Sequence, residues 1–328
     1  MVSCSKKNEA QPVVPEVIVP MPEPPAEPVV FQPLVDIQSA KKITLTTATI
    51  VAKVIPNDTA TTISFDYKIL GGDWITKMML LKYSGKDSVT VTFDLSDLKP
   101  QTDYSYRVKA TNRIHSSTSP ESYFTTFAVA DYDGNFYHIV TIGTQTFTKE
   151  NFRGTHYANG DPIANVTDAT TWSQLTTGAY CWYDNDFKIG KVYGGLYNFY
   201  VGADSRGLII GWHVPTVEEW IHLINDLGGY LFSGPKIMET GLIHWNSTRR
   251  LATNISGFTA LPWGDFGISK LTNKFEFMDL GTSAAFLASS DLGSLANAAF
   301  IDASVCVFNP CLLFEKCSSF SIRLLRNK

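Results

Sequence analysis

The sequence has little charge and lacks any basic run. Asp, Glu, Lys and Arg together make up 18% of the 328 residues, the formal net charge is −4, and no more than two Lys or Arg residues are adjacent. Soluble proteins carry about 25% charged residues. A nucleic-acid-binding surface needs clustered cations that neutralise phosphates. We therefore expect no nucleic-acid partner.

A long apolar run is also missing. No stretch approaches the about 20 residues that a membrane-spanning helix needs. Hydrophobic residues nevertheless make up 44% of the chain and aromatic residues 12%, which is enough for packed cores. A chain of this length fits two folded domains rather than one. We expect a multidomain protein rich in sheets and loops.

The N-terminus has one cysteine in a suggestive position. Cys4 follows Val2 and Ser3, as in the last residues of a bacterial lipoprotein signal, in which the cysteine receives the lipid. The charged start and apolar run that normally precede such a cysteine do not stand before Cys4 here. The alternative is a cysteine without a role in a frayed terminus. We expect lipid on Cys4, and with it an outer-membrane lipoprotein at the cell surface or on the periplasmic face.

A proline-rich segment follows the cysteine. Residues 11–33 contain eight of the sixteen prolines and no glycine. Each proline fixes φ and removes a hydrogen-bond donor, so we expect an extended linker and no helix or central strand. A ligand for proline-recognition domains is the alternative. We assign residues 1–33 to the lipoprotein N-terminus and linker.

Residues 34–128 alternate apolar and polar side chains with a period of two. Runs such as 62–67, 88–93 and 104–108 are separated by turn residues, which predicts an antiparallel sandwich of about seven strands. The segment 98–112 contains Leu-x-Pro-x-Thr-x-Tyr and resembles the corner before strand F of fibronectin type III domains. The resemblance implies an all-β immunoglobulin-like sandwich in which the Tyr104 hydroxyl bonds to nearby backbone.

The second domain, residues 129–328, opens with a short acidic segment. Asp131, Asp133 and Asn135 could belong to a calcium loop, but the downstream ligands of such a loop are missing. Asp133-Gly134 between apolar residues is typical of a hairpin. We predict a turn and no metal.

The densest motif is Gly211–Trp220. Thr216 and Glu219 have the spacing of a capping box, apolar residues then follow at helical spacing, and Gly228-Gly229 provides a stop. We predict a helix here, with Glu219 as a structural cap rather than a general base. His213 and His222 do not share the i, i+4 spacing of two zinc ligands on one helix face, so we expect no zinc site.

Residues 131–328 resemble the Fibrobacter succinogenes major paralogous domain, which is common in surface and secreted proteins of Bacteroidota. The matching segments lie in family order: 133–137, 142–145, 150–152, 178–186, 193–200, 211–220, 239–245 and 254–262. The resemblance implies an α+β C-type-lectin-like fold, and no general activity goes with the family. Two cysteines that resemble the disulfide pair of lectin-like folds are often found where this chain has Leu208 and Leu324. We expect these leucines to pack together.

The remaining cysteines have two interpretations. Cys181, Cys306, Cys311 and Cys317 could form disulfides in an exported protein, in any of three pairings. Alternatively, Cys306 and Cys311 have the spacing of the copper-binding cysteine pair of formylglycine-generating enzymes, which would make the protein an enzyme on that fold. Cys306 lies among apolar neighbours, which disfavours a reactive thiolate.

Two aromatic segments are candidates for a ligand-binding surface. In lectin-like folds, binding surfaces are usually built on long loops. Aromatic rings can stack on sugars or anchor protein partners, with nearby carboxylates fixing orientation. The alternative is that the rings are core residues and the acids form turns. The candidate ligand-binding residues are Trp182, Tyr183, Asp184, Asp186, Trp263, Asp265 and Phe266.

Taken together, these patterns favour a non-catalytic, lipid-anchored protein of the cell envelope. The first domain would be a spacer, and the second would bind a glycan, a protein or an outer-membrane complex. The sequence lacks the Glu-Pro-Asn or Gln-Pro-Asp triplet of calcium-dependent lectins. We assign no catalytic residue and expect no cofactor.

Overall fold

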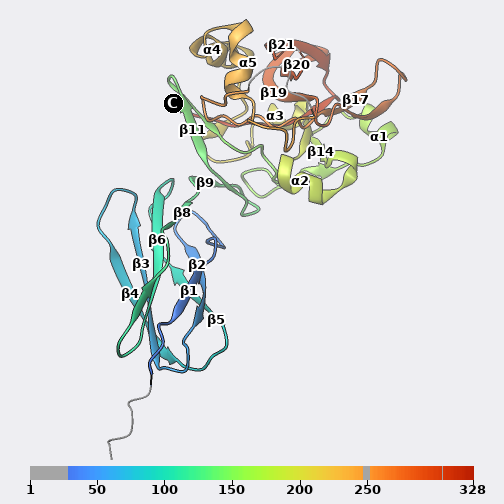
Figure 1. Cartoon of the computed structure of the whole chain (residues 1–328). Helices are drawn as coiled ribbons and strands as arrows, with labels where there is room; N and C mark the ends of the chain where they lie inside the picture. Colours follow the sequence, from blue (N-terminus) through green and yellow to red (C-terminus); the bar gives the residue numbers. More distant parts are fainter. Residues whose placement is uncertain (1–28, 247–251, 305) are drawn as a thin grey trace, which may run out of the picture.

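The computed structural model describes residues 29–246, 252–304 and 306–328. They form a β-sandwich and a second, larger unit of sheets and helices that lies beyond one end of the sandwich (Figure 1). Cys4 and the linker up to residue 28 lie outside the described residues. Among the helices in the described ranges, none is long and apolar enough to cross a membrane.

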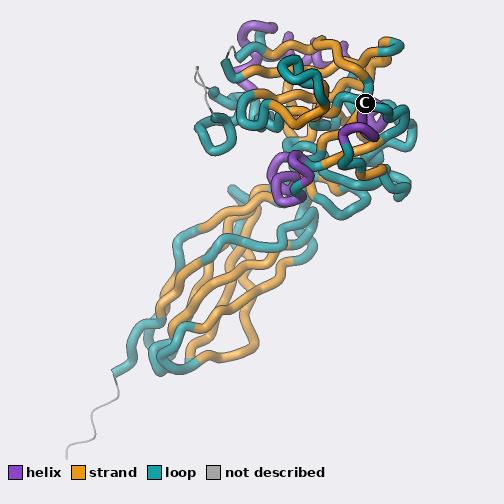
Figure 2. The backbone as a smooth tube through the Cα atoms, turned by 90° about the vertical axis from the view of Figure 1, so that its right-hand side faces the viewer, coloured by secondary structure: helices purple, strands orange, loops and turns teal. Residues whose placement is uncertain are grey.

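Two antiparallel sheets form the sandwich, as the period-two alternation predicts. One sheet has the order β1-β2-β5 and the other β4-β3-β6-β7, with β8 also paired to β6. Their strands run along the length of the sandwich (Figure 2). The strand bounds are β1 (Leu34–Ile37), β2 (Ala48–Ile55), β3 (Thr61–Ile69), β4 (Ile75–Tyr83), β5 (Val89–Leu95), β6 (Asp103–Thr111), β7 (Ser116–Thr118) and β8 (Ser122–Thr125).

The inward residues of both sheets make the core of the sandwich, in which Phe65 and Tyr106 are fully buried. Tyr104, at the start of β6, is also buried, and its hydroxyl accepts a hydrogen bond from the Lys99 backbone N–H at 2.9 Å. The predicted tyrosine corner is therefore confirmed.

The sandwich and the second unit touch at a small joint. The Gln101 side-chain amide accepts from the Ile139 N–H at 3.2 Å and donates to the Ile139 carbonyl at 3.4 Å. Beside it, the ring of Phe127 lies 4.2 Å from the ring of His138 and 5.6 Å from that of Phe136, centroid to centroid. We call Gln101, Phe127, Phe136, His138 and Ile139 the interdomain joint.

Short strands dominate the second unit. A hairpin comes first, followed by sheets in the orders β11-β12-β23-β16, β13-β14-β15-β22-β17-β18 and β19-β20-β21. The bounds are β9 (Val129–Ala130), β10 (Phe136–Tyr137), β11 (Ile139–Ile142), β12 (Gln145–Thr148), β13 (Ala164–Asn165), β14 (Ala179–Cys181), β15 (Leu196–Asn198), β16 (Trp212–His213), β17 (Asp265–Ile268), β18 (Phe275–Met278), β19 (Ser283–Leu292), β20 (Leu295–Asp302), β21 (Phe308–Glu315), β22 (Ser319–Phe320) and β23 (Leu325–Arg326).

The helices of this unit are short, and the predicted one is confirmed. Helix α4 begins after Thr216, which forms a capping box with Glu219 in the first turn, and ends before Gly228 and Gly229, whose φ angles of 92° and 94° suit glycine. Its apolar face covers the core through Trp220. The helix bounds are α1 (Ala169–Ser173), the 3₁₀ turn η1 (Tyr183–Asn185), α2 (Phe187–Tyr193), α3 (Phe199–Gly202), α4 (Val217–Asp226) and α5 (Tyr230–Ile237).

A buried arginine ties together several segments of the second unit. Arg323 is 1% exposed, and its guanidinium donates to the carbonyls of Thr148, Phe258 and Thr259 at 2.9–3.1 Å and to the Asn151 side chain. Burial lowers the pKa of Arg323 to about 9, and the nearby carboxylate of Glu150 opposes this shift only in part. These bonds satisfy backbone groups that water cannot reach.

Leu208 and Leu324 are both buried, with exposures of 2% and 1%, and they belong to the same hydrophobic cluster. Aliphatic packing therefore occupies the region in which the resemblance implies a disulfide in other members.

Candidate functional site

The predicted aromatic binding surface is wrong, because the rings lie in the core. Trp263 is fully buried, and Trp182, Tyr183 and Phe266 have exposures of 8%, 8% and 3%. The two segments do meet, with the Tyr183 and Trp263 ring centroids 5.8 Å apart, but they meet inside a hydrophobic cluster. Removal of such large rings from water stabilises the folded state, so the rings pack in the core. The core interpretation of these residues holds.

The acids of these two segments have structural roles. Asp184 is exposed with φ 49° inside η1, and Asp186 caps α2 by accepting the Lys188 N–H at 2.8 Å. Asp265, at the start of β17, is 9% exposed. Burial, and then the neighbouring charge of Asp279, raises the pKa of Asp265 to about 7. Of these three acids, only Asp184 and Asp186 are accessible to a ligand.

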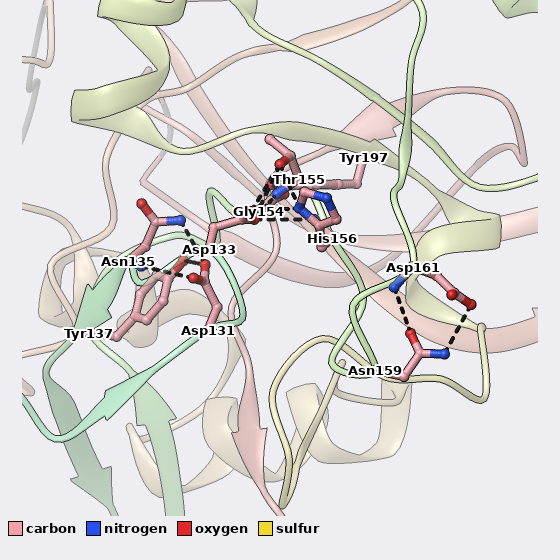
Figure 3. Close-up of polar contacts among 10 residues, drawn as sticks. All are labelled: Asp131, Asp133, Asn135, Tyr137, Gly154, Thr155, His156, Asn159, Asp161 and Tyr197. Carbon is pink, nitrogen blue, oxygen red and sulfur yellow. Dashed lines mark hydrogen bonds and ion pairs between the residues drawn. The ribbon is translucent and has the colours of Figure 1, made fainter.

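The acidic segment at the start of the second unit forms the predicted hairpin turn, shown in Figure 3. The carboxylate of Asp131 accepts the N–H and the side-chain amide of Asn135 at 2.9 and 2.8 Å and the Tyr137 hydroxyl at 2.6 Å. These donors occupy the oxygens that a calcium ion would need, so Asp131 holds the hairpin.

Asp133 reaches out of the same turn to a second segment (Figure 3). It accepts from the Thr155 N–H at 2.5 Å and from Nδ1 of His156 at 2.6 Å. Burial raises the pKa of Asp133, but the bonds from Thr155 and His156 outweigh it and leave the pKa lowered. Within the described ranges, no three His, Cys, Asp or Glu side chains are grouped so that they could hold a metal ion.

A cleft of about 320 Å³ lies beside helix α4, which we call the α4 cleft. Helix α4 lines it with Glu218, Glu219 and His222. Strand β16 contributes His213, and β12 contributes its first residue, Gln145. The full lining is Thr144, Gln145, His213, Glu218, Glu219, His222, Leu325, Arg326, Asn327 and Lys328.

Two groups in this cleft that resemble catalytic residues, Glu219 and His213, are hydrogen-bonded to neighbouring parts of the fold. Glu219 accepts the Thr216 backbone N–H at 2.9 Å and contacts Nε2 of His213 at 3.0 Å. The other ring nitrogen of His213 lies 2.6 Å from the Asn327 side-chain oxygen. A general base needs a carboxylate or imidazole that can reach a substrate proton. The capping role predicted for Glu219 is confirmed.

One polar atom of the cleft lining has no partner. The Gln145 side chain is fixed by its Nε2, which donates to the Glu219 carbonyl at 3.0 Å, and its Oε1 is buried without a hydrogen bond. A buried polar atom of this kind usually has a partner. The sequence motif indicates the helix beside the cleft, but Gln145 lies 74 residues before Glu219, and no local pattern connects them.

Cys306 and Cys311, the candidate copper ligands, lie in different surroundings. Cys306 is 2% exposed in a hydrophobic cluster, whereas Cys311 is exposed on β21. Burial, and then the charge of Glu218, raises the pKa of the Cys311 thiol. Burial also raises the pKa of Cys181, and burial together with Glu315 raises that of Cys317 to about 11. Raised pKa values disfavour the reactive thiolate. This arrangement does not favour the enzyme alternative.

One comparison with known proteins concerns the C-terminal part. The model of the Fibrobacter succinogenes major domain matches residues 140–326. None of the curated proteins compared with the chain matches it. Among solved structures, the sensor domain of the anti-sigma factor RsgI4 of Pseudobacteroides cellulosolvens is 26% identical over 30% of this chain and 92% of its own, with a TM-score of 0.24. The third fibronectin III domain of human KIAA0343 is 15% identical over 28% of this chain and 78% of its own, with a TM-score of 0.17.

Proposed function

Because the chain belongs to the Fibrobacter succinogenes major domain family, we propose that it is a non-catalytic binding protein of the bacterial cell envelope. In this proposal, lipid on Cys4 anchors the chain to the outer membrane, and residues 1–33 and the sandwich hold the second unit away from the lipid. The second unit has the C-type-lectin-like fold and binds a glycan or a protein of the outer membrane.

The observation that carries this proposal is that Glu219 and His213 are already hydrogen-bonded within the fold. Both groups belong to the densest motif of the chain, and both are bonded to structural partners. Because Glu219 and His213 already have structural partners, the cleft suits binding better than acid–base turnover by these two groups.

The spacer role rests on the position of the sandwich. It lies between the described N-terminal end and the second unit in Figure 1. Its core is apolar and its corner tyrosine is bonded internally, and neither feature presents chemistry to solvent.

Retention on immobilised glycans, with analysis of the released material, tests the binding function. The purified full chain should be retained by at least one envelope or dietary polysaccharide and should release no shorter sugar from it. Release of shorter sugars by the full chain, and by a Glu219→Gln variant to a lesser extent, would contradict a non-catalytic function.

The lipid anchor has its own test. The Cys4→Ala variant, expressed in a bacterium that processes lipoproteins, should move from the membrane fraction to the soluble fraction. A Ser3→Ala variant keeps the cysteine and serves as the matched control. Unchanged membrane association of Cys4→Ala would contradict the anchor while leaving the binding function open.

A further inference from the structure

A second cleft lies on the second unit, and its four charged residues lie outside the sequence motifs. It has a volume of about 410 Å³, within the range of small-ligand sites. Helix α3 forms one wall with Phe199 and Tyr200, and Asp291 comes from the end of β19. We call it the α3 cleft, and its lining is Thr176, Thr177, Gly178, Phe199, Tyr200, Ala203, Asp204, Arg206, Asp291 and Lys316.

The charges of the α3 cleft are arranged as two bonded pairs. Arg206 donates to both carboxylate oxygens of Asp204, at 2.9 and 2.7 Å, and to Asp161 at 3.0 Å, and Nζ of Lys316 lies 2.6 Å from Asp291. Hydrogen bonds from Arg206 lower the pKa of Asp204, and the bond from Lys316 lowers that of Asp291. The two cations are therefore bonded to three carboxylates, which leaves no excess positive charge at the cleft.

Aromatic rings hold both cations in place. The guanidinium of Arg206 lies 3.7 Å from the Tyr157 ring centroid, and Nζ of Lys316 lies 4.6 Å from that of Phe199. Tyr200 is partly exposed beside them, with its ring 6.0 Å from that of Phe199. Cation–π contacts and ion pairs together fix the donors and acceptors before a ligand arrives.

This combination suits hydroxyl groups. Each sugar hydroxyl both donates and accepts a hydrogen bond, and a carboxylate beside a guanidinium or ammonium offers both roles to neighbouring hydroxyls. An aromatic ring at the edge supplies an apolar face for the C–H side of a sugar ring. An anionic ligand would gain little here, because each cation is already paired.

We propose that the α3 cleft binds a neutral oligosaccharide, with Tyr200 against a sugar ring and the Asp204–Arg206 and Asp291–Lys316 pairs bonded to its hydroxyls. This proposal rests on the proposed binding function and adds the site and the class of ligand. It differs from the predicted aromatic surface, since Trp182 and Trp263 play no part in it.

Calorimetric titration of the full chain with four neutral hexasaccharides tests the proposal. The probes are β-1,4-linked glucose, xylose and mannose and α-1,4-linked glucose. At least one should bind saturably, and Tyr200→Ala and Asp204→Asn should each weaken that binding about tenfold or more. Tyr230→Ala, at a partly exposed tyrosine on α5, is the matched control and should leave it unchanged.

Two further measurements separate the outcomes. Thermal melting of each variant shows whether the fold is kept, and titration at about 0.5 M NaCl should change the affinity less than about twofold, because the ligand is neutral. Absence of binding to all four probes, or binding that Tyr200→Ala leaves unchanged in a folded protein, overturns the proposal. Binding that survives Tyr200→Ala would leave the proposed function standing, whereas cleavage of a probe would overturn that function itself.

Discussion

Asp265 shows how the fold sets the properties of a single side chain. Its carboxyl is buried at the start of β17, near the second acid Asp279, and its pKa is raised to about 7. In the unfolded chain the pKa returns to about 3.9. The folded state therefore holds this proton more tightly, and the stability that Asp265 contributes is complete below about pH 4 and is lost as the pH rises to about 7.

Replacement of Asp265 by Asn should therefore stabilise the protein at neutral pH. The gain over the parent protein should be near zero at pH 4 and reach about 2–4 kcal/mol above pH 7, because each pKa unit corresponds to about 1.4 kcal/mol. Urea unfolding of both proteins across this pH range measures the difference. The control is Asp184→Asn, at an exposed position, and a gain for Asp265→Asn that is independent of pH would contradict the argument.

Arg323 is the opposite case, a buried charge that the fold needs. Replacement by Met removes the donor to three carbonyls and to Asn151, so we expect a loss of about 3–5 kcal/mol in the free energy of unfolding. Arg326→Met, at an exposed arginine over the Trp212 ring, should cost less than about 1 kcal/mol. Chemical denaturation measures both, and equal losses would show that the buried bonds add nothing.

At the scale of elements, the sequence predicts best where the signal is local. The Tyr104 corner and the Thr216–Glu219 cap each depend on residues within about six positions, and both are confirmed. The aromatic segments around Trp182 and Trp263 are predicted wrongly for a different reason. Their burial depends on contacts between segments about 80 residues apart, and residue type alone does not distinguish a core ring from a binding ring.

The corner itself can be tested by removing one oxygen. Tyr104→Phe keeps the buried ring, which stacks 5.3 Å from Phe124, but leaves the Lys99 N–H without its acceptor. We expect a loss of about 1 kcal/mol, the usual net value of one hydrogen bond. Thermal unfolding of the full chain measures it. Tyr123→Phe on β8, with its exposed ring, should cost nothing.

At the scale of the whole molecule, the α3 cleft explains why a site can escape sequence analysis. Asp204 and Asp291 lie 87 positions apart. Asp204 is paired with Arg206, two positions away, and Asp291 with Lys316, 25 positions away. Charged residues of this kind are common on any surface, and only the tertiary fold brings the two pairs to one cleft. The Gly211–Trp220 motif, by contrast, is visible in the sequence because it forms a helix.

The interdomain joint determines whether the sandwich is a rigid or a swivelling spacer. The Gln101 amide and the Phe127 ring attach the sandwich to the chain at His138 and Ile139. Glu150 accepts the His138 N–H at 2.8 Å and contacts its ring at 2.7 Å, so the far side of the joint is fixed to the second unit. Loss of Gln101 and Phe127 should therefore free the sandwich without unfolding either part.

We expect the double variant Gln101→Ala/Phe127→Ala to separate the tumbling of the two parts. In the parent protein, nitrogen-15 relaxation should give one shared rotational correlation time for the sandwich and the second unit, because the joint holds them together. In the double variant, the correlation time of the sandwich should fall below that of the larger unit. Tyr123→Ala, which removes an exposed ring from β8 close to the joint, is the matched control and should keep the shared value. A shared correlation time in the double variant, or separate values in the parent protein, would show that Gln101 and Phe127 do not set the orientation in which the second unit is presented.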